Sequence, residues 1–398
     1  SEPDKLQRQE LYGPIWSSLK QKMADARDLD PDVIQTFADE HSLSLFREAG
    51  FDGLAYAEEQ GIIDGIKNYP EFRAYMIERF GKAEDEERDT YPHITAGAYL
   101  AQIEQEDDNR DSEDAVAVVF VEGVIQTGKM RPGVAGSADI APLLRRAHEN
   151  DKTRAIVMRV NSPGGSILGS DQIRDELEAA AKKGLPVIVS MGDVAASGGV
   201  WISTPADTIF AEPTTITGSI GVAVAFPTVE NVLDYIGVNL DGVTTSQHAG
   251  WNPARPVDEK LDAIFARWAS SAYQRFINVV ADSRDKESDY IRSIAGGRVW
   301  LAPAALELGL IDKLGTMEDA IEYAAARAGL ETYRVDYVVQ PVSPAMQLLR
   351  RFSITATDSH ARSFNLFAES ASRLMETLDK LGQPRATVMC TACSVELL

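Results

Sequence analysis

The chain has 398 residues, of which 44% are hydrophobic, so it is long enough to bury one large core or two smaller ones. Its formal net charge of −22 excludes nucleic acid as a partner, because phosphate binding depends on clustered lysine and arginine that the chain lacks. Its longest apolar runs are about seven residues, against the roughly 18 to 20 needed to cross a bilayer, so we expect a soluble chain.

Residues 1–104 are predicted to be mostly helical. The pair Asp30-Pro31 is typical of a helix start, since proline is favoured at the first helical position. Residues 105–114 are mostly acidic and polar, and such a composition does not pack into a core. We therefore expect a solvated linker there, with a domain boundary.

From residue 115 the pattern changes to short, β-branched apolar runs separated by helical stretches. The runs cover residues 115–121, 154–160, 186–191, 208–213 and 222–226. Fully apolar strands interleaved with helices predict a buried, largely parallel sheet in an α/β layered domain, which we assign to residues 115–340. Residues 341–398 are expected to form a C-terminal helical extension.

That extension carries the two cysteines of the chain, Cys390 and Cys393, in a C-x-x-C pair. They are either inert thiols or a small disulfide formed in an oxidising compartment. There is no second cysteine pair, and the five histidines do not approach ligand spacing with one another, so we expect no metal site. We expect no cofactor either.

The chain also resembles itself. Residues 51–66 are similar to residues 298–314, and the helix around Trp16 is similar to the helix around Trp268. This indicates one whole repeat preceded by the tail of another, with a natural protein that continues upstream of Ser1. The alternative is chance similarity between two amphipathic helical regions.

Two loops that follow apolar strands contain residues suited to chemistry. In residues 161–166, the adjacent glycines leave backbone N–H groups uncovered near a helix start, where negative charge is favoured. This suits an oxyanion hole, and equally an ordinary tight turn. In residues 192–199, Ser197 is flanked by alanine and glycine, so a substrate could approach its hydroxyl and the Gly198 N–H could point to the same oxygen. The alternative is a helix start packed tightly on the sheet.

A serine hydroxyl needs a base before it can act as a nucleophile. His248 is the one histidine of the α/β region that follows Ser197, and it has no acidic residue beside it in the sequence. A Ser-His-Asp triad is therefore open but unsupported, and an exposed loop histidine is the simpler interpretation.

Three segments together resemble one family. VNSPGGS (160–166), MGDVAASGGVWIST (191–204) and PTTITGSIGV (213–222) are similar in order and spacing to the signature segments of the signal peptide peptidase A (protease IV) family. The resemblance extends over most of the chain and is to the long, tandem-repeat form, with most of the first repeat lacking. It implies a crotonase-like fold of the Clp-protease type and a Ser-Lys dyad.

Carried onto this sequence, the resemblance makes Ser197 the nucleophile and Gly164 and Gly198 the oxyanion hole. It makes Ser219 the residue that orients the general base. The base departs from the pattern of short family members, because residues 243–253 contain no lysine. In the long form the lysine belongs to the first repeat, so we expect it to lie upstream of this chain, and we expect this chain alone to be inactive.

The resemblance implies a serine endopeptidase that degrades apolar peptides, such as cleaved signal peptides, through an acyl-enzyme. It also implies a homo-oligomer, a tetramer in the family, and a bacterial inner-membrane location with the catalytic part facing the periplasm and a membrane anchor upstream. Two other functions remain open at this point. One is a crotonase-type acyl-CoA enzyme, for which we find no basic site for the CoA phosphates, and the other is a non-catalytic assembly scaffold.

Overall fold

The computed structural model describes residues 2–47, 52–83, 90–96, 99–100, 102–103, 112–224, 228–238 and 252–340. His248, both cysteines and the predicted C-terminal extension lie outside these ranges. The chain divides into two compact units, Ser1–Asp111 and Ser112–Leu398, and each is described by itself. No helix among the described residues is both long enough and apolar enough to span a bilayer.

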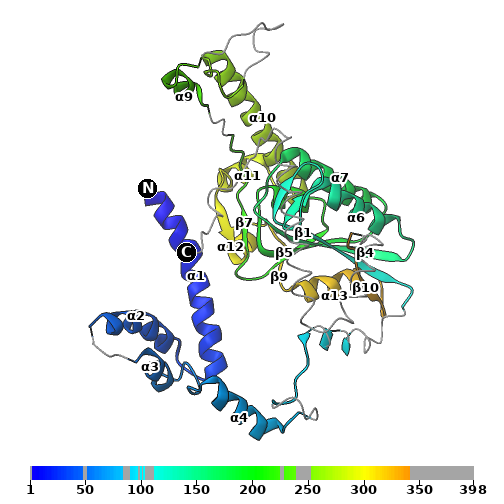
Figure 1. Cartoon of the computed structure of the whole chain (residues 1–398). Helices are drawn as coiled ribbons and strands as arrows, with labels where there is room; N and C mark the ends of the chain where they lie inside the picture. The colour runs from blue at the N-terminus through cyan, green and yellow to red at the C-terminus, as the bar shows by residue number, and fades with distance from the viewer. Residues whose placement is uncertain are drawn as a thin grey trace. The chain divides into compact units, whose positions relative to one another are not determined.

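The first unit is helical where it is described (Figure 1). Its helices are α1 (Glu2–Arg27), α2 (Pro31–Arg47), α3 (Gly53–Glu59) and α4 (Tyr69–Phe80). Helix α2 begins at Pro31, as predicted from the Asp30-Pro31 pair. Its described core is small and consists of Leu11, Ala24, Ile34 and Ala57. Since packing of an apolar face supplies most helical stability, this unit has little internal stabilisation.

The second unit is built on a mostly parallel sheet with strand order β10-β1-β4-β5-β6-β9. These strands are β1 (Ala115–Glu122), β4 (Thr153–Ser162), β5 (Val187–Ala196), β6 (Thr208–Ala211), β9 (Lys313–Leu314) and β10 (Arg334–Tyr337). The short strand β7 (Ile216–Gly218) extends β5 in parallel and pairs with β8 (Val299–Leu301) in antiparallel. Strands β2 (Val124–Gln126) and β3 (Val134–Gly136) form a separate parallel pair.

Helices cover both faces of this sheet (Figure 1). The described helices of this unit are α6 (Ser137–Glu149), α7 (Ile167–Lys182), α8 (Gly198–Ser203), α9 (Glu230–Tyr235), α10 (Glu259–Arg284), α11 (Ser288–Ile294), α12 (Ala302–Glu307) and α13 (Met317–Arg327), of which α9 projects away from the sheet (Figure 1). On β1, Val119 packs into the core shared with α6 and α7, whereas Val118 packs into the core shared with α13. Both faces of the strands are buried, which explains why their sequences are continuous apolar runs. The predicted α/β layered fold with a largely parallel sheet is confirmed.

Two details of the strand prediction were wrong. Residues 192–196, predicted as loop, continue β5, because β7 gives them a hydrogen-bonding partner that the sequence pattern did not indicate. Residues 222–224, predicted as the start of a strand, have no regular structure, and the remainder of that run lies outside the described residues. The backbone leaves the sheet at Ser219, where φ is 51°. The next carbonyl, that of Ile220, accepts from Gly297 N at 3.1 Å, outside the strands.

The internal repeat is visible as one arrangement that occurs twice. Helices α1 and α10 each have 26 residues. The last arginine of α1, Arg27, donates to the carbonyl of Gly61 and to the carboxylate of Asp64. The same donor, carbonyl and carboxylate recur in the second unit as Arg284, Gly309 and Asp312.

The two glycines have nearly the same positive φ, 71° and 72°. Trp16 precedes Arg27 by as many residues as Tyr273 precedes Arg284. Trp16 therefore corresponds to Tyr273, whereas we had expected it to correspond to Trp268. The similarity between the two regions therefore extends to their hydrogen bonds, whereas the predicted match of the two tryptophans is displaced by several positions.

Helices α6 and α7 are joined through Glu176. Its carboxylate accepts from Arg145 Nε at 3.0 Å and from His148 Nε2 at 3.0 Å. Burial alone would raise the pKa of Glu176, but the hydrogen bonds from Arg145 and His148 outweigh it and hold this pKa below the ordinary value of 4.5. A lowered pKa means that the ionised carboxylate stabilises the fold above pH 4.5, and that this stabilisation is lost as the pH falls below it.

We therefore expect Glu176→Gln to lower the free energy of unfolding at pH 7 by about 1 to 2 kcal/mol. The difference from the unchanged protein should shrink as the pH is lowered below 4.5. Urea unfolding at a series of pH values measures it, with Glu331→Gln at an exposed position as control. A difference in the free energy of unfolding that stays constant with pH would show that the Glu176 carboxylate is not the stabilising group.

Candidate active site

Ser197 stands at a strained turn between β5 and α8. Its φ of 52° and ψ of −113° lie outside the regions that side chains with a Cβ favour. Its N–H donates to Gly218 O at 2.9 Å, and its carbonyl accepts from Trp201 N at 3.0 Å, which fixes both ends of the turn. Although Ser197 is the N-cap residue of α8, its hydroxyl does not cap the helix. The N-terminus of α8 therefore leaves this hydroxyl unused.

The glycine pair of the first predicted loop lies directly against this turn. A Cβ on Gly164 would lie 2.6 Å from Gly198 N and 2.8 Å from Ser197 Cβ. A Cβ on Gly165 would lie 2.0 Å from Ile125 O. Real Cβ contacts are longer than this, so only glycine fits at either position. The two loops that the sequence singled out therefore meet at Ser197.

The backbone N–H groups near Ser197 differ in their partners. Gly164 N donates to Ser162 Oγ at 3.1 Å. Gly165 is paired with Ile125 in a parallel β-bridge. The hydrogen bonds of this bridge are made by the residues on either side of Gly165: Ile125 N donates to Gly164 O, and Ser166 N donates to Ile125 O. In such a bridge the N–H of the central residue points to the opposite side. The Gly165 N–H consequently faces Gly198, whose own N–H begins α8 and has no partner within the helix.

Ser219 is brought close to Ser197 by the pairing of β5 with β7. Ala196 is paired with Gly218, so the two serines follow paired residues at the same edge of the sheet. Ser219 is buried, has a φ of 51°, and donates its N–H to Arg298 O at 2.7 Å. Thr217 Oγ1 donates to Ala195 O at 2.7 Å, which adds a side-chain hydrogen bond to this register.

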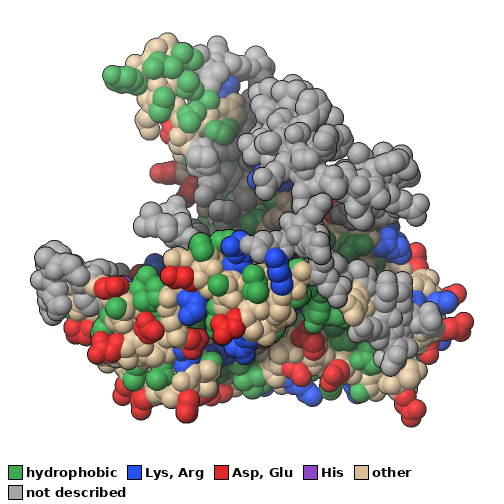
Figure 2. Space-filling model, turned by 60° about the horizontal axis from the view of Figure 1, so that its bottom comes forward, with side chains coloured by type: hydrophobic (Ala, Val, Ile, Leu, Met, Phe, Trp, Pro, Cys, Tyr) green, Lys and Arg blue, Asp and Glu red, His purple; other side chains and the backbone are tan. Residues whose placement is uncertain are grey.

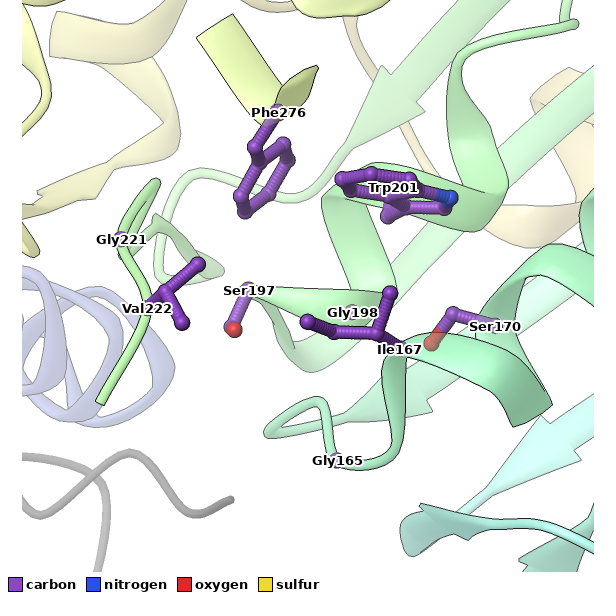
Figure 3. A pocket seen from close by; sticks show the side chains of 9 residues that line it. All are labelled: Gly165, Ile167, Ser170, Ser197, Gly198, Trp201, Gly221, Val222 and Phe276. Carbon is purple, nitrogen blue, oxygen red and sulfur yellow. The ribbon is translucent and has the colours of Figure 1, made fainter. Parts of the chain in front are cut away.

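A pocket opens beside the Ser197 hydroxyl (Figure 3). It is lined by Gly165, Ile167, Ser170, Ser197, Gly198, Trp201, Gly221, Val222 and Phe276. The Ser197 hydroxyl points into the space between Val222 and Ile167 (Figure 3). Four of these residues lie within or just after the sequence motifs but were not predicted to belong to the site: Ile167, Ser170, Trp201 and Val222. Phe276 comes from α10, far along the chain from every motif.

One wall of the pocket is held by an ion-pair network. Asp171 on α7 accepts from Trp201 Nε1 at 2.9 Å and from two guanidinium nitrogens of Arg275 at 2.9 Å each. The rings of Trp201 and Phe276 lie 4.9 Å apart, centroid to centroid. Helix α10 is thereby attached to the helix that follows the candidate nucleophile.

The lining residues in the described part of the chain include no lysine, histidine or carboxylate. Lys182 and Lys183, at the far end of α7, bind Glu178 at 2.8 Å and His148 at 2.9 Å. Within the described ranges no three His, Cys, Asp or Glu side chains cluster as metal ligands would. The described arrangement places a serine hydroxyl beside two backbone amides, a combination suited to nucleophilic attack with stabilisation of an oxyanion.

Comparison with known proteins gives consistent matches. Residues 179–331 match the family described as Peptidase family S49. The chain is 35% identical over 339 residues to "Protease 4" of Haemophilus influenzae, which covers 85% of this chain and 54% of that protein. It is 32% identical over 240 residues to "Putative protease slr0021" of Synechocystis sp., which covers 59% of this chain and 85% of that protein.

Among solved structures, a ClpP1 mutant from Listeria monocytogenes matches with a TM-score of 0.32 and 15% identity, over 51% of this chain and 94% of that chain. The chain spans about half the length of the curated Protease 4 relatives that it matches.

The contact between Gly164 and the Ser197 turn makes a prediction. Gly164→Ala should displace the start of α8, lower the free energy of unfolding by about 2 to 3 kcal/mol, and reduce any reactivity of Ser197 by at least about 100-fold. Gly184→Ala is the matched control, since Gly184 also has a positive φ, 81°, but nothing lies within 4 Å of its Cβ position. Thermal unfolding and the rate of labelling by a fluorophosphonate measure the two effects. Equal losses in both variants would mean that backbone strain alone accounts for the result.

Proposed function

This chain belongs to peptidase family S49, the signal peptide peptidase A family, and from that membership we propose that it is the catalytic part of a serine endopeptidase with Ser197 as nucleophile. The observation that carries the proposal is the strained turn that presents the Ser197 hydroxyl to a pocket and to two backbone amides. Such a turn raises the energy of the fold, and strain of this kind concentrates at functional sites.

In the proposed reaction, Ser197 Oγ attacks the scissile carbonyl carbon while its proton passes to the base. The carbonyl oxygen becomes an oxyanion, held by the N–H groups of Gly198 and Gly165. We assign the second donor to Gly165 instead of Gly164, because the Gly164 N–H is already directed to Ser162 Oγ. When the intermediate collapses, the C–N bond breaks and the amine leaves with the proton that the base had taken from Ser197. This leaves an acyl-enzyme, which water hydrolyses.

The proposed base is a lysine from the part of the longer protein that this sequence does not include, oriented by the Ser219 hydroxyl. Two observations support it: no base is among the described residues of the pocket, and the chain spans about half of its Protease 4 relatives. A lysine can accept the proton near neutral pH only if desolvation lowers its pKa. The buried position of Ser219 is compatible with such a site.

The proposed substrates are apolar peptides, such as cleaved signal peptides. Support comes from the side chains of Ile167, Trp201, Val222 and Phe276, which make the pocket walls apolar. The bacterial inner-membrane location, with the catalytic part facing the periplasm and an anchor upstream, is part of the same proposal.

The first test is the dependence of peptide hydrolysis on Ser197 and on the upstream sequence. We expect the protein extended upstream to hydrolyse an apolar peptide ester, and Ser197→Ala to abolish this hydrolysis while changing the free energy of unfolding by less than about 1 kcal/mol. Ser219→Ala should lower the rate by roughly 10- to 100-fold, as loss of a positioning group for the base would.

The 398-residue chain alone should show no turnover. Robust Ser197-dependent turnover by this chain would show that a base lies within it, and His248→Ala would then identify whether that base is His248.

We also propose that the protein acts as a homo-oligomer, a tetramer as in the family. Around α9 and along α10, the side chains of Val232, Tyr235, Ile236 and Trp268 are between 50% and 91% exposed. Figure 2 shows hydrophobic side chains gathered on this projecting part of the second unit. An apolar patch of this kind is typical of a surface that another chain covers.

Multi-angle light scattering of the extended protein should give the mass of four subunits. Tyr235→Glu together with Trp268→Glu should reduce that mass, because burying two carboxylates without partners is unfavourable. A monomer at micromolar concentration would contradict the proposal.

A further inference from the structure

Ser170 is a buried hydroxyl that the reaction described above does not use. It lies one turn into α7, is 1% exposed, and its Oγ has no hydrogen-bond partner among the described residues. A serine in a helix commonly donates to the carbonyl four residues before it. Ser203 on α8 does so, to Gly199 O at 2.7 Å. The corresponding carbonyl of Ser166 accepts from the backbone N of Ser170 at 2.9 Å, and the Ser170 hydroxyl makes no hydrogen bond to it.

It points toward the oxyanion site. A Cβ on Gly198 would lie 2.7 Å from Ser170 Oγ and 3.2 Å from Gly165 N, so the hydroxyl and the amide border the same small space. Ser170 also lines the pocket that contains Ser197, and Figure 3 shows its hydroxyl on the side that faces Gly198 and Ile167. A buried hydroxyl without a partner destabilises a fold, so one that is retained at a substrate pocket indicates a bound group that completes it.

The shape of the pocket limits what that group is. Its cavity volume, about 20 Å³, is enough for a group of the size of a water or a hydroxyl. Among the described residues of its lining, Ser197 and Ser170 carry hydroxyl groups and the other side chains are mainly apolar. A hydroxyl both donates and accepts, so it can pair with Ser170 Oγ in either direction.

We propose that Ser170 is a specificity-determining residue that hydrogen-bonds the side chain of the residue on the acyl side of the scissile bond, and that the pocket selects serine there. This inference rests on the proposed peptidase function. It adds that an apolar peptide is cut after a small, hydroxyl-bearing residue.

The test uses the protein extended upstream and peptide esters that differ only in the residue that forms the ester. The informative pair is serine and α-aminobutyrate, which replaces the hydroxyl by a methyl group of similar size. We expect kcat/KM to be about tenfold higher for serine, since the analogue leaves the Ser170 hydroxyl unpaired. Ser170→Ala should bring this ratio close to one, because kcat/KM for the serine ester falls about tenfold relative to that for the α-aminobutyrate ester.

Ser203→Ala is the matched control, because Ser203 is also buried in a helix near the site but does not line the pocket. It should keep the serine preference and lower the melting temperature, since it loses the hydrogen bond to Gly199 O. Ser170→Ala should not lower the melting temperature, because no protein hydrogen bond is lost.

The outcomes separate the two claims. Two results overturn this inference while leaving the peptidase function in place. The first is Ser197-dependent hydrolysis in which the unchanged protein has nearly the same kcat/KM for the serine ester and the α-aminobutyrate ester. The second is a serine preference that Ser170→Ala does not change. Equal loss of both rates in Ser170→Ala also overturns it, since the residue would then act in the common reaction. Absence of any Ser197-dependent hydrolysis overturns the peptidase function and this inference with it.

Discussion

The hydrogen bond from Ser197 N to Gly218 O, 2.9 Å long, is the interaction on which the site depends. It joins the turn that carries the proposed nucleophile to the end of β7, and it holds Ser197 at a φ of 52° that a residue with a side chain seldom adopts. Because β7 pairs in parallel with β5, the same contact places Ser219 next to Ser197. One short strand therefore determines both the strain at the nucleophile and the position of the serine proposed to orient its base.

Close backbone approach is the second constraint. Gly164 and Gly198 are so near each other that a single added Cβ would overlap the other's backbone, and Gly165 is equally close to β2. This packing leaves two amide groups on the nucleophile side, which is the preorganised arrangement that oxyanion stabilisation requires. The energetic cost of the strained turn is offset by the large buried sheet beneath it, where Val160, Val189 and Ala195 are fully buried.

The α/β fold could be predicted, and Ser197 could be singled out as a candidate nucleophile, because their signals are local. Continuous apolar strands between helices gave the parallel sheet, and small residues around Ser197 indicated an accessible hydroxyl. Strand β7 was missed because its three residues carry no periodic pattern, and its pairing with β5 is a tertiary contact. The choice of Gly165 over Gly164 depends on which way an N–H points, which follows from the bridge to Ile125 and not from residue type. Phe276 lies far along the chain, so no spacing argument connects it to Ser197.

The central claim is that Ser197 becomes acylated by substrate and does so only with a base from outside this chain. Trapping the acyl-enzyme with a slowly hydrolysed peptide ester, followed by digestion and mass spectrometry, measures this directly. The account predicts an acyl mass on the peptide that contains Ser197 in the protein extended upstream, and no added mass in the 398-residue chain under the same conditions. An acyl group on any other residue, or equal acylation of both proteins, would contradict it.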